Sequence, residues 1–130
     1  MPAHVLVIDD DQSILELFRL ILEPEGYQVT LSKSAFEDVQ EVDQLKPDLI
    51  IMDFKLGRHE DGFLLLQKIK MYRPTKDIPI ILCTAAVDIV VEQENVLREK
   101  GIPILYKPFD VDELLMVVER LLKNPPTSPG

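Results

Sequence analysis

Five short apolar runs, separated from one another by segments with helical periodicity, restrict the fold of this chain more than any other feature. The runs lie at residues 5–8, 29–31, 49–52, 78–82 and 102–105. The first, third and fourth runs are continuous and rich in Val and Ile, which is typical of buried parallel strands. The second run alternates with polar neighbours, like a half-exposed edge strand. The sequence therefore predicts five strands.

The intervening segments place apolar residues three or four positions apart, as on one face of a helix. The predicted faces are Ile14, Leu17, Phe18, Ile21 and Leu22; Val39, Val42 and Leu45; Leu65, Leu66, Ile69 and Tyr72; and Val111, Leu114, Leu115, Val118 and Leu122. Residues 88–100 give a weaker pattern, because polar residues interrupt it. Ser34 with Glu37 and Asp110 with Glu113 are predicted capping pairs. Alternating strands and helices predict an α/β fold, a doubly wound parallel sheet covered on both faces.

The size and charge of the chain narrow its class. Its 130 residues suit one domain, and no apolar run approaches the roughly 20 residues of a membrane helix. The start lacks the features of a signal peptide, so we expect a cytoplasmic protein. A formal net charge of −9 disfavours direct contact with nucleic acid or anionic membranes. Residues 124–130 contain three prolines and are expected to form a tail after a domain at 1–123.

Polar side chains follow four of the five strands, where ligands bind in open α/β sheets. They are Asp9, Asp10 and Asp11 after the first strand, Asp53 after the third, Thr84 after the fourth and Lys107 after the fifth. Two carboxylates about 4 Å apart repel by roughly 4 kcal/mol at an effective dielectric near 20. A bound cation would relieve this repulsion, and an all-oxygen ligand set favours Mg²⁺ or Mn²⁺ over zinc.

The same pocket suits phosphoryl transfer to a carboxylate. Asp53 stands alone after a central strand and is the predicted nucleophile, whereas Asp9 and Asp10 form a pair suited to a metal. Lys107 can neutralise phosphoryl oxygens, and the hydroxyl of Thr84 can donate a hydrogen bond to them.

Other interpretations of the chain remain open at this point. A metal-dependent phosphohydrolase would use Asp53 in the same way, but Lys55 stands where a second aspartate is expected and no cap domain is inserted. An interaction module that never becomes phosphorylated is a third possibility. Flavin or nucleotide binding is disfavoured, because the first strand leads into acids rather than a phosphate cradle. The lone Cys83 is predicted to be a core residue.

Five ordered motifs give the chain a resemblance to a known family. They are residues 7–11, 48–53, Asp61-Gly62, Thr84-Ala85 and residues 107–109, Lys-Pro-Phe. Over about residues 4–123 the chain resembles the receiver domain of two-component response regulators. The resemblance implies a three-layer flavodoxin-like sandwich with strand order 2-1-3-4-5.

The resemblance also implies roles for individual residues. Asp53 would accept a phosphoryl group from a histidine kinase or phosphotransfer protein, with Mg²⁺ required. Asp10 would bind the metal directly, Asp9 mainly through a water, and Lys55 through its main-chain carbonyl. The Lys107–Pro108 peptide bond would be cis. Such a protein is a switch rather than a turnover enzyme, catalysing only its own phosphoryl transfer and slow autodephosphorylation, and its partners would meet residues 88–122.

The chain departs from the family pattern near the site. The aromatic residue expected three positions before the lysine is replaced by Ile104, while Tyr106 adjoins Lys107. The loop after Asp53 is one residue longer than usual and has Gly57 where proline is common. The segment before Lys107 is one residue shorter. These changes bear on how the phosphorylated state is sensed and how long it lasts.

Overall fold

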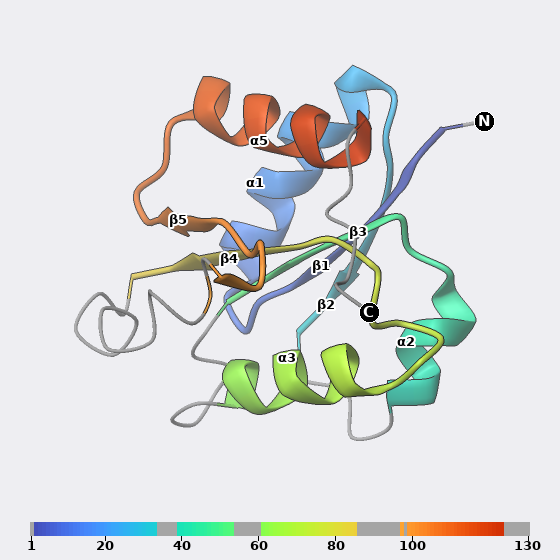
Figure 1. Ribbon diagram of the computed structural model, residues 1–130. Coiled ribbons are helices and arrows are strands. Elements are labelled where there is room, and N and C mark those ends of the chain that lie inside the picture. Colours follow the sequence, from blue (N-terminus) through green and yellow to red (C-terminus); the bar gives the residue numbers. More distant parts are fainter. Residues whose placement is uncertain (1, 34–38, 54–60, 86–96, 98, 124–130) are drawn as a thin grey trace.

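The computed structural model describes residues 2–33, 39–53, 61–85, 97 and 99–123, with the side chains of residues 61–63 excepted. It contains a five-stranded sheet in the order β2-β1-β3-β4-β5, in which all neighbouring strands are parallel (Figure 1). The strands are β1 (His4–Ile8), β2 (Gln28–Ser32), β3 (Leu49–Met52), β4 (Ile80–Thr84) and β5 (Ile104–Tyr106). The predicted α/β fold and strand order are confirmed, with β2 as the half-exposed edge strand.

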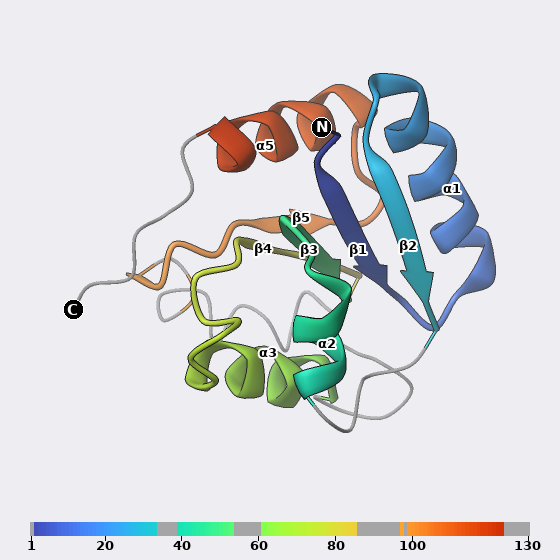
Figure 2. The ribbon, with the colours of Figure 1, turned by 90° about the vertical axis from the view of Figure 1, so that its right-hand side faces the viewer.

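Helices cover both faces of this sheet. The described helices are α1 (Gln12–Leu22), the 3-10 turn η1 (Glu23–Glu25), α2 (Val39–Leu45), α3 (Asp61–Met71) and α5 (Val111–Lys123). Helices α1 and α5 lie on one side of the sheet and α2 and α3 on the other (Figures 1 and 2). Of the weakly predicted helix at 88–100, only Leu97, Glu99, Lys100 fall within the described residues, and Leu97 is buried.

The two core clusters follow from the alternation of side chains along the strands. Val5 and Val7 pack with Phe18 on the side of α1 and α5. Leu6 and Ile8 point to the opposite side and pack in the cluster that includes residues of α2 and α3. Every residue of the central strand β3 is buried, which explains why its sequence is a continuous apolar run.

Two strands begin later than predicted, and proline explains the difference. The apolar runs at 78–82 and 102–105 contain Pro79 and Pro103, which have no backbone N–H for the sheet. Their carbonyls accept hydrogen bonds from Ile50 and Leu82, both at 3.0 Å, but the strands begin only after each proline.

Two predicted core positions on the helices are wrong. Leu17 is 40% exposed and Val111 is 44% exposed. In α1 the buried face passes through Leu15, Phe18 and Leu22, so Leu17 lies at its edge. Val111 is the first residue of α5, before the helix reaches the core.

The predicted cap of α5 is confirmed in part. Asp110 Oδ1 accepts a hydrogen bond from the backbone N–H of Asp112 at 3.0 Å. The predicted capping pair Ser34 and Glu37 lies outside the described residues.

Candidate functional site

The backbone brings the predicted site residues to one end of the sheet. Asp9 N–H donates to the carbonyl of Ser32, and Asp53 N–H donates to the carbonyl of Ile8, both at 3.0 Å. Lys107 N–H donates to the carbonyl of Thr84 at 2.9 Å. Asp9, Asp53 and Lys107 thus each extend the backbone hydrogen bonding of the parallel sheet by one residue beyond the carboxyl end of a strand. This hydrogen bonding fixes the backbone positions from which the three side chains project.

Burial distinguishes the acids from an ordinary solvated surface. Asp9 is 2% exposed and Asp53 is 8% exposed, and Thr84 at the end of β4 is fully buried. Asp10 is exposed. Charged groups are rarely buried unless another group compensates them. The site therefore requires a counter-charge for Asp9 and Asp53.

Lys107 supplies part of that charge. Its Nζ lies 2.7 Å from Asp9 Oδ2 and 3.1 Å from Asp53 Oδ2, so one ammonium bridges two carboxylates from different strands. The sequence placed Lys107 in the pocket as a ligand of phosphoryl oxygens and did not predict this bridge. Lys107 follows β5 at the same end of the sheet as the acids, and this position in the sequence could have indicated the bridge.

The protonation equilibria of this pair reflect burial and charge together. Burial raises the pKa of Asp9, although the hydrogen bond and charge of Lys107 act in the opposite direction. Burial alone would lower the pKa of Lys107, but its bond to Asp9 and the charges of Asp53 and Asp9 raise it above the usual lysine value. Lys107 consequently stays charged, while Asp9 binds a proton more tightly than a solvated aspartate does.

The acids can also hold a metal ion. Asp9, Asp10 and Asp53 each offer a carboxylate oxygen, and these atoms lie within 4.8 Å of one another. An all-oxygen set of this kind suits Mg²⁺ or Mn²⁺. The pKa of Asp9 is raised mainly by burial, and the negative charge of Asp53 adds a smaller effect in the same direction. A bound cation would oppose both effects and favour the ionised carboxylate. The residues present therefore match a hard divalent cation.

Asp11 has a different task that the sequence did not reveal. Its Oδ1 accepts hydrogen bonds from Ser13 N–H at 2.9 Å and Ser13 Oγ at 2.6 Å, which makes it the N-cap of α1. Its own N–H donates to Asp9 Oδ1 at 3.0 Å. Asp11 thus couples the start of α1 to the orientation of Asp9. The pattern Asp-x-Ser before a helix was the signal that could have identified this cap.

The segment that carries Lys107 is held by aromatic packing. The ring of Phe109 stacks on Phe18 of α1, with centroids 5.2 Å apart. The Lys107–Pro108 peptide bond is cis, as predicted. Ile104 and Tyr106 both pack toward the cluster of α2 and α3, and Tyr106 is the register partner of Thr84. Lys55 and Gly57, which the sequence singled out, lie outside the described residues.

None of the described helices is long and apolar enough to cross a membrane.

The family model of the response regulator receiver domain matches residues 5–119. Over 124 residues the chain is 36% identical to the DNA-binding dual master transcriptional regulator RpaA of Synechocystis sp., covering 95% of this chain and 50% of that protein. It is 35% identical over 130 residues to the response regulator MprA of Mycobacterium sp., covering 99% of this chain and 54% of that one.

Solved structures agree with these sequence matches. A putative response regulator from Chloroflexus aurantiacus superposes with a TM-score of 0.82 at 31% identity, covering 95% of this chain and 100% of that one. The chain spans about half the length of the two curated relatives named above. The acids at one end of a parallel sheet, the bridging lysine and these matches lead to one conclusion: the chain belongs to the response regulator receiver domains of two-component systems.

Proposed function

We propose that the chain is a phosphorylation switch in which Asp53 accepts a phosphoryl group from the phosphohistidine of a histidine kinase or phosphotransfer protein. The observation that carries the proposal is the bridge from Lys107 Nζ to Asp53 at 3.1 Å and to Asp9 at 2.7 Å. It places a fixed positive charge beside a buried carboxylate at the end of a central strand. That arrangement can receive an anionic group.

Asp53 has the chemistry of the nucleophile. A carboxylate oxygen of Asp53 would attack the phosphorus of the phosphohistidine, forming a P–O bond as the P–N bond breaks and the imidazole leaves. Lys107 Nζ is close enough to turn from the carboxylates to a transferred phosphoryl oxygen. Thr84 ends the neighbouring strand β4, and we propose that its hydroxyl donates to a second phosphoryl oxygen.

Asp9, Asp10 and Asp53 would hold Mg²⁺. The family resemblance adds the main-chain carbonyl of Lys55 as a further ligand. When bound, the cation supplies neutralising charge to the phosphoryl oxygens. Asp9 and Asp10 follow β1 directly, so the fold holds them against the neighbouring Asp53 before any donor arrives. The protein contributes to cation binding by holding these carboxylate oxygens close together.

The partner-binding surface is proposed to include β5, α5 and residues 88–100. Lys107 N–H is bonded to Thr84, and Lys107 leads through Phe109 into α5, so a change at the phosphoryl site can alter this region. The relative RpaA is described as DNA-binding. The formal net charge of −9 makes direct DNA contact by this chain unfavourable. We therefore propose that the chain switches the binding of a partner rather than contacting DNA itself.

Mass spectrometry of the intact protein tests the proposal. Incubation with Mg²⁺ and a small phosphodonor such as acetyl phosphate should add the mass of one phosphoryl group. The Asp53→Asn chain should gain none, and EDTA should suppress the gain in the unchanged protein. Glu41→Gln removes one exposed carboxylate on α2 and serves as the matched control.

Equal labelling of the unchanged and Asp53→Asn chains would show that Asp53 is not the acceptor. No labelling under any condition, with the variants folded, would instead favour an interaction module that works without phosphorylation.

A further inference from the structure

A groove lies at the amino end of the sheet, opposite the end that carries Asp9 and Asp53. Its volume is ≈ 600 Å³, which falls within the usual range of ligand pockets. The residues that line it come from just before β1, β3 and β4, from the turn after α3 and from the last turn of α5. They include Pro2, Pro47, Pro74, Pro79, Leu121 and Leu122. We call this hollow the amino-end groove.

The chemistry of the amino-end groove restricts what can fill it. The carboxylates of Asp48 and Asp77 line it, and none of its described lining residues is basic. Asp48 Oδ2 accepts a hydrogen bond from His4 N–H at 2.7 Å, so this carboxylate is held in place. An acidic segment would be repelled by the two carboxylates. A neutral segment with apolar rings and hydroxyl donors fits both the apolar walls and the carboxylates.

We propose that residues 124–130 of the same chain occupy the amino-end groove. The segment reads Asn-Pro-Pro-Thr-Ser-Pro-Gly, with three prolines and no charged side chain. The hydroxyls of Thr127 and Ser128 can donate hydrogen bonds to the carboxylates of the groove. Leu122 lines the groove and Lys123 ends α5, so the segment begins at the rim. In a polyproline conformation of about 3.1 Å per residue, it spans about 20 Å.

The groove and the segment belong to one chain, which favours their association. A short connection of this kind gives an effective concentration in the millimolar range. Proline loses almost no side-chain freedom on ordering, and its φ is fixed beforehand, so the entropic cost is low. The seated segment ties the end of α5 to the starts of β1 and β3. Neither the cation nor the phosphoryl group takes part, so this inference goes beyond the switch proposed above and is tested apart from it.

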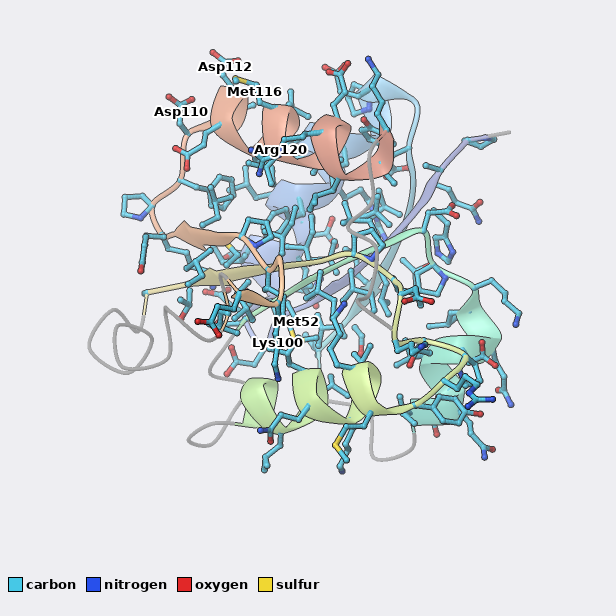
Figure 3. The ribbon with its side chains drawn as sticks, in the orientation of Figure 1. Met52, Lys100, Asp110, Asp112, Met116 and Arg120 are labelled. Carbon is cyan, nitrogen blue, oxygen red and sulfur yellow. The ribbon has the colours of Figure 1, made fainter. Side chains whose placement is uncertain are left out.

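Disulfide trapping within one chain gives the sharpest test. The Ala3→Cys, Ser128→Cys chain should close a disulfide under mild oxidation several times faster than the Met116→Cys, Ser128→Cys chain. Met116 is 71% exposed on the outer face of α5, as Figure 3 shows, whereas Ala3 is partly buried, so accessibility alone favours the control. Met116 lies about 10 Å along the helix axis from the end of α5, within reach of the segment. The native Cys83 is buried.

The charge of the segment provides a second test in the same Ala3→Cys, Ser128→Cys chain. Thr127→Glu should slow the trapping several-fold, because it sets a third carboxylate beside Asp48 and Asp77. Thr127→Lys adds a charge of the opposite sign and should not slow it. Circular dichroism confirms that each variant is folded, and mass spectrometry distinguishes disulfides within one chain from those between chains.

Three results would overturn the inference. One is a control pair that closes as fast as the Ala3→Cys, Ser128→Cys pair, because random motion of the segment would then explain the disulfide. Another is equal slowing by Thr127→Glu and Thr127→Lys. The third is a disulfide that forms between chains rather than within one, which would assign the groove to a second copy.

Discussion

Lys107 is the residue on which the site's charge balance depends. Its ammonium bridges Asp9 and Asp53 and is itself mostly buried, so its removal leaves two buried carboxylates without this partner. Removing one member of a buried pair is usually more harmful than lacking the pair altogether. The same ammonium competes with any divalent cation for these carboxylates.

Replacing Lys107 should therefore separate cation binding from phosphoryl acceptance. We expect Lys107→Met to bind Mg²⁺ about tenfold more tightly, since a competing positive charge is lost, yet to gain less phosphoryl mass. Isothermal titration and mass spectrometry measure the two effects. Lys107→Arg keeps the charge and should shift the cation affinity less. Weaker Mg²⁺ binding by Lys107→Met would contradict the competition.

Cys83 gives a prediction about reactivity. Burial raises the pKa of its thiol to about 12, and the residue is 1% exposed. Because the thiolate is the reactive species, Cys83 should react very slowly with a disulfide reagent in the folded protein at neutral pH. Reaction in urea should be complete within the mixing time of a manual assay. Rapid labelling of the folded protein would mean that β4 opens easily.

At the level of the elements, the stack of Phe109 on Phe18 joins α1 to the segment that leads into α5. Helix α1 follows the acids directly, and Phe109 lies two positions after Lys107. The stack thus connects the two halves of the site through the core. Such aromatic pairs contribute about 0.5–1.5 kcal/mol beyond the area they bury.

A double-mutant cycle should detect this connection. Phe18→Leu and Phe109→Leu are each expected to lower the free energy of unfolding in urea, with a coupling of about 1 kcal/mol between them. A control cycle of Phe109→Leu with Leu66→Ala, which lies in the other core cluster, should be additive within about 0.5 kcal/mol. Additivity of the two Phe changes would show that the rings do not support each other.

At the level of the whole molecule, a cation that binds only the folded state stabilises it by mass action. At a Mg²⁺ concentration of about 100 times its dissociation constant, the gain in unfolding free energy should be about 2.7 kcal/mol. Thermal unfolding with Mg²⁺ and with EDTA measures it. Asp9→Asn should lose most of the gain, while Glu41→Gln should keep it. An equal gain in both variants would place the ion elsewhere.

The acids also set how stability depends on pH. The folded-state pKa of Asp9 is raised by burial, so the folded protein holds this proton more tightly than the unfolded chain does. Without a cation, the Asp9 contribution to stability therefore decreases as pH rises from 3.8 through the folded-state pKa. In EDTA, the unfolding free energy of the unchanged protein should fall relative to that of the Asp9→Asn chain as pH rises over that interval. A difference independent of pH would contradict this sign.

The fold could be predicted from the sequence pattern, because a strand that is buried on both faces of a sheet must be a continuous apolar run, as Leu49–Met52 is. The carboxyl ends of parallel strands meet at one edge, so Asp9, Asp53, Thr84 and Lys107 could be placed together without coordinates. Both arguments depend only on the period of the side chains and the direction of the chain. They needed no contact distances.

The packing had to come from the tertiary structure, because it depends on contacts between residues far apart in the sequence. The pairing of Lys107 with Asp9 joins positions 98 residues apart. It results from the position of β5 in the sheet, where β3 and β4 separate it from β1. The exposure of Leu17 depends on how α1 turns its face to the sheet. The acidic pocket was thus predictable from local order, while its counter-charge was decided by how the strands and helices meet.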